Sequence, residues 1–74
     1  MAKGKTTIRN QIRVLRFTHA EMTQQSLADR IGVSRQTLNA IEGCKYSPAL
    51  EVAFRIAAVF GEPLEAVFQH HPEE

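Results

Sequence analysis

The chain has 74 residues, a formal net charge of +1 and a single cysteine, Cys44. A chain of this length forms one small domain whose core supplies only a few kcal/mol, so association with a second copy is expected to add stability. One cysteine excludes an intrachain disulfide and a multi-cysteine metal site, and no apolar run approaches the roughly 18 residues of a membrane span. We therefore expect a single domain over residues 1–74 of a cytoplasmic protein that does not enter the membrane.

The first predicted helix spans about residues 8–18, where the apolar residues Ile8, Ile12 and Leu15 recur at helical spacing. Arg9, Arg13 and Arg16 lie on its other side. A second helix, QQSLADRI at residues 24–31, follows Thr23, whose hydroxyl can cap it. Gly32 then ends this helix, because glycine adopts the left-handed conformation without steric cost.

A third helix begins after Ser34, another good N-cap, and turns Leu38 and Ile41 inward. Only GVS separates it from the second helix, so the chain must bend sharply there, and Ala28 is small where the two helices approach. This spacing is typical of a helix-turn-helix at about residues 24–43, whose second helix enters the major groove of DNA. An ordinary helical hairpin would show the same apolar pattern.

Ser47 followed by Pro48 predicts the start of a fourth helix, with proline at its first position. Five apolar residues form its buried stripe: Leu50, Ala53, Ile56, Ala57 and Phe60. Pro63 opens a short fifth helix that contains Leu64, Val67 and Phe68. The tail QHHPEE either stays loose or lets VFQHH pair as an edge strand with KTTIR near the amino end.

The outer face of the third helix carries Arg35, Gln36 and Asn39 at positions i, i+1 and i+4. Arginine can bind guanine through two hydrogen bonds, and glutamine and asparagine match the donor and acceptor of adenine. Charge supports an anionic partner, since residues 1–46 carry eight basic against three acidic residues, and residues 47–74 one against five. The same counts would arise if the two parts of the chain only had differently charged surfaces in contact with water. We interpret the helix face as one that reads the bases of double-stranded DNA.

From Ile12 to about Phe68 the chain resembles the lambda-repressor-like helix-turn-helix family, which contains Cro and repressor proteins and the xenobiotic-response-element regulators. The resemblance rests on TQQSLADRIGVSRQTLNAIE and KYSPALEVAFRIAAVFGEPLEAVF. More narrowly, SRQTLNAIE with KY.P and the ending PLEAVFQ is similar to a compact group that includes the enterococcal cytolysin repressor.

The resemblance implies an all-α domain of five helices and a homodimeric repressor that binds an inverted-repeat operator. In the compact group it also implies a small two-stranded antiparallel sheet that joins the chain ends. Carried over by position, Arg35, Gln36 and Asn39 would contact bases. The residues expected to contact phosphates are Gln24, Ser34, Thr37, Lys45 and Tyr46.

One departure from the family pattern concerns the turn after the third helix. The family usually places glycine one residue before the lysine, whereas this chain reads EGCK, with Gly43 one place early and Cys44 where glycine is expected. If the backbone needs a positive φ at that place, Cys44 is strained by roughly 1 kcal/mol or more. We expect Gly43 to take up the turn instead.

The fourth and fifth helices hold more apolar residues than one buried face requires: Val52, Phe54, Val59, Leu64 and Val67. An exposed surplus would promote aggregation unless a partner subunit covers it. We expect a two-fold interface that includes Phe54, Leu64 and Val67. Such a dimer would set two recognition helices about one DNA turn apart, roughly 34 Å.

Other chemistries find little support in the sequence. No nucleophile and base stand at motif spacing, so no catalytic residue, cofactor or small-molecule ligand is expected. The three histidines lack partners at ligand spacing, so no metal is expected, and Cys44 is either inert or a redox switch beside DNA. The main alternative is an antitoxin-like interaction module that neutralises a partner protein. Repression is favoured over activation, because so small a domain has little surface for contacting polymerase.

Overall fold

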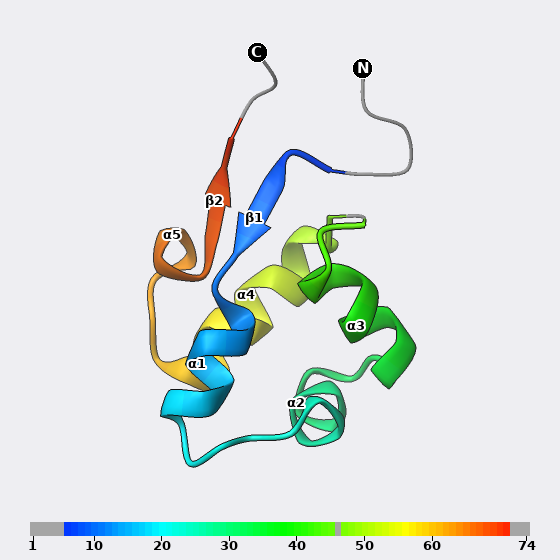
Figure 1. The fold of residues 1–74 in the computed structure, drawn as a ribbon, viewed down its shortest axis with the longest axis vertical. Coiled ribbons are helices and arrows are strands. Elements are labelled where there is room, and N and C mark those ends of the chain that lie inside the picture. The colour runs from blue at the N-terminus through cyan, green and yellow to red at the C-terminus, as the bar shows by residue number, and fades with distance from the viewer. Residues whose placement is uncertain (1–5, 46, 72–74) are drawn as a thin grey trace.

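Five helices and two short strands make up the part of the computed structural model that is described, residues 6–45 and 47–71 (Figure 1). In chain order they are β1 (Ile8–Asn10), α1 (Ile12–Thr18), α2 (Gln24–Ile31), α3 (Arg35–Glu42), α4 (Leu50–Phe60), α5 (Leu64–Val67) and β2 (Phe68–His70). The strands lie side by side and lead away from the helices toward the chain ends. The predicted five-helix class is confirmed, together with the small sheet.

The strands β1 and β2 form an antiparallel pair. Its register sets Ile8 opposite His70, Arg9 opposite Gln69 and Asn10 opposite Phe68. The Gln11 N–H donates to the Val67 carbonyl at 2.8 Å, so the pairing continues to the ends of α1 and α5. Of the two expectations for the tail, the edge strand is therefore correct, although it is FQH that pairs with IRN. Phe68, predicted in the fifth helix, begins β2 instead.

The first helix begins at Ile12, so the predicted start at residue 8 is wrong. Asn10 stops the helix from extending toward the amino end. Its Oδ1 accepts a hydrogen bond from the Ile12 N–H at 3.2 Å, and its Nδ2 donates to the Ile41 carbonyl of α3 at 2.9 Å. Ile8 has helical spacing to Ile12, but pairing with β2 decides its backbone conformation.

The helix-turn-helix forms as predicted, with both N-caps in place. The Thr23 hydroxyl accepts from the Ser26 N–H at 3.0 Å, and the Ser34 hydroxyl accepts from the Thr37 N–H at 3.0 Å. Gly32 ends α2 with φ +77°, a conformation that a side chain would strain. These local interactions fix the bend that sets α3 against α2.

A single apolar cluster holds the helices together. It contains Ile12, Leu27, Ala28, Ile31, Leu38, Ile41, Ile56, Ala57, Phe60 and Val67. Arg55 of α4 adds a polar tie, because its Nη1 donates to the Ile31 carbonyl at 3.1 Å and so satisfies the C-terminal end of α2. The helix-turn-helix is therefore anchored on α4 and has its outer surface free.

The fourth helix begins later than predicted. It starts at Leu50 after Ala49, and no side chain caps it, so the assignment of Ser47 as N-cap and Pro48 as first helical residue is wrong. Pro48 is half-buried and lines an apolar hollow beside Leu64. Packing of this segment across the domain thus overrides the local cap preference.

The turn after α3 is made by Cys44 and not by Gly43. Cys44 has φ +59°, whereas Gly43 has φ −82°, so the expectation that Gly43 takes up the turn is wrong. The Cys44 N–H donates to the Ile41 carbonyl at 3.0 Å, which fixes the left-handed residue at this place. The place where the family usually has glycine is therefore left-handed here but is occupied by cysteine.

We predict that Cys44→Gly raises the free energy of unfolding by about 0.5–1 kcal/mol, because relief of the left-handed strain exceeds the added freedom of the unfolded chain. Urea denaturation measures the change. The control is Gly61→Ala at φ +66°, where nothing lies within 4 Å of the added methyl group. There the strain should outweigh the reduced freedom of the unfolded chain, so stability falls. A loss of stability in Cys44→Gly would contradict the prediction.

Candidate nucleic-acid interface

The predicted base-contacting residues share one exposed face of α3. Arg35, Gln36 and Asn39 are all exposed, whereas Leu38 and Ile41 on the opposite side are buried. Together with Gln24 of α2, the three exposed side chains line a hollow of about 140 Å³. The structure thus places the residues predicted to contact bases at one site, beside the first residue of α2.

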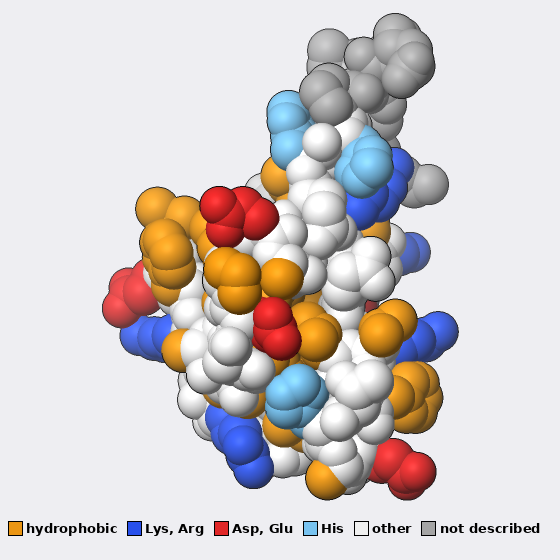
Figure 2. Space-filling view, turned by 90° about the vertical axis from the view of Figure 1, so that its left-hand side faces the viewer, with side chains coloured by type: hydrophobic (Ala, Val, Ile, Leu, Met, Phe, Trp, Pro, Cys, Tyr) orange, Lys and Arg blue, Asp and Glu red, His pale blue; other side chains and the backbone are white. Residues whose placement is uncertain are grey.

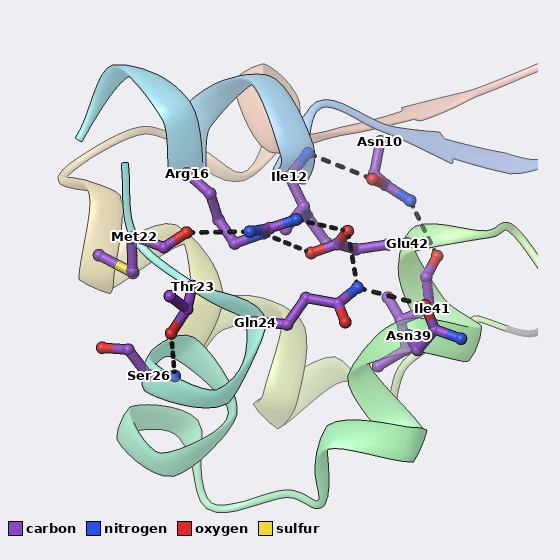
Figure 3. A network of polar contacts seen from close by, with 10 residues as sticks. All are labelled: Asn10, Ile12, Arg16, Met22, Thr23, Gln24, Ser26, Asn39, Ile41 and Glu42. Carbon is purple, nitrogen blue, oxygen red and sulfur yellow. Dashed lines mark hydrogen bonds and ion pairs between the residues drawn. The ribbon is translucent and has the colours of Figure 1, made fainter. Parts of the chain in front are cut away.

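A polar network lies directly behind this face (Figure 3). The Arg16 Nε donates to Glu42 Oε2 at 2.8 Å and its Nη2 donates to Glu42 Oε1 at 3.2 Å. The Gln24 Nε2 donates to Glu42 Oε1 and to Asn39 Oδ1, both at 3.2 Å. A chain of hydrogen bonds therefore connects a nearly buried ion pair to the exposed Asn39 side chain of α3.

Arg16 differs from its sequence interpretation as part of a polar helix face. Its side chain is 10% exposed and that of Glu42 is 7% exposed, and its Nη1 also donates to the Met22 carbonyl at 2.9 Å. A buried guanidinium requires such a partner, since an unpaired charge there would be costly. Arg16 is consequently unavailable to DNA, and the sequence contained no indication that Glu42 would lie opposite it.

The hydrogen bonds of the Gln24 side chain leave it no donor for the phosphate contact that was predicted. An amide nitrogen has two hydrogens, and those of Gln24 are directed at Glu42 and Asn39. Phosphate oxygens accept only, so the remaining Gln24 oxygen cannot bind one. In this arrangement Gln24 supports Asn39 from behind, and a side-chain contact with phosphate would require one of these bonds to break.

Three more residues predicted to contact phosphates, Ser34, Thr37 and Lys45, lie at the edges of the same face. The Ser34 hydroxyl donates to Thr37 Oγ1 at 3.0 Å, which leaves the Thr37 hydroxyl hydrogen free to donate outward. Lys45 is exposed just beyond α3. Tyr46 lies outside the described residues, so its predicted contact stays a prediction.

Arg13 is a cationic neighbour that sequence reasoning did not assign to the site. It is exposed on α1 and lines a hollow of about 360 Å³ together with Asn39 and Lys45. Helical spacing placed Arg13 on a polar face, but only the packing of α1 against α3 brings it to the recognition helix. The charged surface therefore extends from α3 across to α1.

The apolar surface expected to form a dimer is smaller than predicted. Val67 is fully buried, so its assignment to an interface is wrong, and Leu64 is half-buried. Val52 and Val59 also pack against the core. Phe54, at 54% exposed, remains, and Leu50, one helical turn before it, is 66% exposed. The two exposed side chains form an apolar patch on α4.

An apolar hollow and an ion pair surround that patch. A hollow of about 270 Å³ adjoins it, lined by Ile8, Ser47, Pro48, Leu50, Ala53, Leu64 and Phe68. Figure 2 shows hydrophobic side chains gathered at one edge of the molecule with acidic and basic side chains beside them. On α4 the exposed Arg55 follows Phe54 and pairs with Glu51 at 2.9 Å, whereas the described residues that line the hollow include no basic or amide side chain.

Residues 6–45 and 47–71 contain neither a metal-binding cluster nor a membrane-spanning helix. Within these ranges no three histidine, cysteine or acidic residues gather closely enough to hold a metal ion. None of the helices in the same ranges has the length and apolar character needed to cross a membrane.

The fold and the polar outer face of α3 define a helix-turn-helix protein. The profile of the family described as Helix-turn-helix matches residues 13–67, and the chain belongs to that family.

Relatives occur in archaea and bacteria. The chain is 43% identical over 67 residues to an uncharacterized HTH-type transcriptional regulator of Methanocaldococcus jannaschii, covering 90% of this chain and all of that protein. It is 36% identical to the uncharacterized HTH-type transcriptional regulator YgzD of Bacillus subtilis, covering 82% and 91% of the two chains. Family membership and these names support the expectation that the chain is not an enzyme.

A solved structure supports the fold independently. A protein from Bacteroides fragilis superposes with a TM-score of 0.71, covering 84% of this chain and 98% of that one. Because the two sequences are only 21% identical, this similarity concerns the fold alone.

Proposed function

We propose that the protein is a sequence-specific regulator of transcription, a homodimeric repressor that binds double-stranded DNA at an inverted-repeat operator. The observation that carries the proposal is the exposed cluster of Arg35, Gln36 and Asn39 on α3 of a helix-turn-helix. Membership of the helix-turn-helix family supports it, as do the names of the relatives. The narrower resemblance to the group that contains the enterococcal cytolysin repressor belongs to the same proposal.

In this proposal α3 lies in the major groove with Arg35, Gln36 and Asn39 facing base edges. Arg35 is suited to guanine, and Gln36 can match adenine through its amide. The exposed cations Arg13 and Lys45 flank these residues, and Thr37 can donate a hydrogen bond from the same helix. The flanking side chains would hold phosphates and so fix the register of the helix on the duplex.

We predict different consequences for the two kinds of contact. Gln36→Ala should relax base preference at one operator position, costing roughly 1–3 kcal/mol there, because a base edge loses its partner. Lys45→Ala should weaken binding to all sequences alike and flatten the dependence of affinity on salt, since one phosphate contact is lost. Binding titrations at several salt concentrations measure both. Identical effects of the two substitutions would contradict the division into base and phosphate contacts.

The dimer is proposed from the apolar patch on α4. Leu50 and Phe54 stand exposed one helical turn apart, next to the apolar hollow beside Leu64. Covering such a patch with its two-fold copy removes apolar area from water, and two recognition helices then meet two half-sites. Beside the patch Glu51 is paired with Arg55 at 2.9 Å, so this surface has no excess of positive charge for phosphates.

We predict that Phe54→Lys converts the dimer to a monomer, because two lysines would be buried against each other at the two-fold interface. Sedimentation equilibrium measures the mass. The matched control is Phe17→Lys, which makes the same change at a side chain that is 61% exposed on α1, and which should leave the dimer intact. A dimer in both variants would place the interface elsewhere, and a monomeric parent protein would contradict the dimer itself.

The experiment that tests the whole proposal is selection of bound duplexes from a random DNA library, with the mass of the protein measured in parallel. We expect an enriched inverted repeat with half-sites about one helical turn apart, bound by a dimer. Weak, salt-sensitive binding to every duplex without enrichment would mean that the α3 face does not read bases. The antitoxin-like alternative would then direct the search toward protein partners.

A further inference from the structure

We infer that Asn39 acts as a hydrogen-bond donor toward DNA, held in that orientation by Gln24, and that the operator position it reads carries guanine or thymine. The inference rests on the proposed function and narrows it, since an asparagine that is free to turn would match adenine as well. Gln24 is then a positioning residue for specificity rather than a phosphate anchor.

The orientation begins at the ion pair behind the helix. Both Glu42 carboxylate oxygens accept from Arg16, at 2.8 and 3.2 Å. A carboxylate held by a guanidinium is an acceptor only, so the Gln24 amide must turn its nitrogen and not its oxygen toward Glu42. The observed distance from Gln24 Nε2 to Glu42 Oε1 is 3.2 Å, in agreement with this requirement.

Gln24 Nε2 also fixes the orientation of the Asn39 amide on α3. Its second hydrogen is directed at Asn39 Oδ1, also at 3.2 Å. Because an amide nitrogen cannot accept, Asn39 must present its oxygen to Gln24. Its own nitrogen then lies on the side away from Gln24 (Figure 3). Asn39 is exposed, so this N–H₂ group is available to a ligand in the groove.

The outward group determines which bases fit. Bidentate recognition of adenine needs the amide oxygen and nitrogen together at the base edge, and the oxygen of Asn39 is held by Gln24. A donor alone pairs with O6 or N7 of guanine, or with O4 of thymine. Adenine also has the N7 acceptor, but its N6 amino group stands where guanine has O6 and opposes a donor there, as the N4 amino group of cytosine does. The Asn39 position should therefore favour guanine and thymine.

Library selection with three proteins tests the inference: the parent protein, Asn39→Ala and Gln24→Met. Asn39→Ala identifies the position, because base preference is lost there alone. At that position the parent should favour guanine or thymine over adenine by about 3- to 10-fold, the range of one net hydrogen bond. Gln24→Met has similar length but no donor, so Asn39 can turn and adenine should rise to match guanine at that position only.

A second variant keeps the test decisive if Gln24→Met fails to fold. Asn39→Asp retains an acceptor for Gln24 but presents only acceptors outward, so the preference should move to adenine or cytosine. Adenine at this position in the parent, or an unchanged preference in both variants, would overturn the inference while leaving the rest of the operator intact. Absence of any enriched sequence would instead contradict the proposed function.

Discussion

Replacing Glu42 with alanine should unfold most of the protein at room temperature. The substitution leaves the Arg16 guanidinium nearly buried without its carboxylate, at a cost of about 3–5 kcal/mol. A single core of this size supplies stability of the same order, so little remains. Circular dichroism during urea denaturation, at fixed protein concentration, measures the loss.

The control for this prediction is the double substitution Arg16→Met with Glu42→Leu. It removes both charges and keeps apolar volume, so it should recover most of the stability lost in Glu42→Ala. Recovery will be incomplete because the Met22 carbonyl loses its bond from Arg16 Nη1, at 2.9 Å. A double variant as unstable as the single one would show that the loss comes from packing and not from the unpaired charge.

Phe60→Ala should lower the free energy of unfolding by about 3–5 kcal/mol, the usual cost of a truncated buried aromatic. Phe60 is 4% exposed in the core cluster, where its ring meets the His19 ring edge-on with centroids 5.0 Å apart. The cavity would open between α4 and the end of α1. Chemical denaturation of the purified variant gives the change directly.

Phe17→Ala is the matched control, because it removes the same ring from a surface where 61% of the residue is exposed. Phe17 keeps one specific contact, a cation–π approach of Arg16 at 6.0 Å from the ring centroid, so its loss should cost at most about 1 kcal/mol. Similar losses in the two variants would contradict the burial assigned to Phe60.

Features that depend on neighbouring residues were predicted from the sequence, and features that depend on distant residues were not. The caps of α2 and α3 and the left-handed Gly32 depend on a few neighbouring residues, and all were predicted correctly. The starts of α1 and α4 were not, since Asn10 bonds to α3 and Pro48 packs beside α5. A helical spacing of apolar residues does not predict a hydrogen-bond partner 31 residues away, as Ile41 is from Asn10.

The helix-turn-helix and the residue types on the outer face of α3 can be predicted from the chain alone, because both follow from caps, one glycine and helical spacing. How that face is held depends on contacts between residues far apart in the chain. Arg16 and Glu42 are 26 residues apart, and their pairing orients Gln24 and through it Asn39. The packing of whole helices also buries Val67, which excludes it from the proposed interface, and leaves Phe54 exposed.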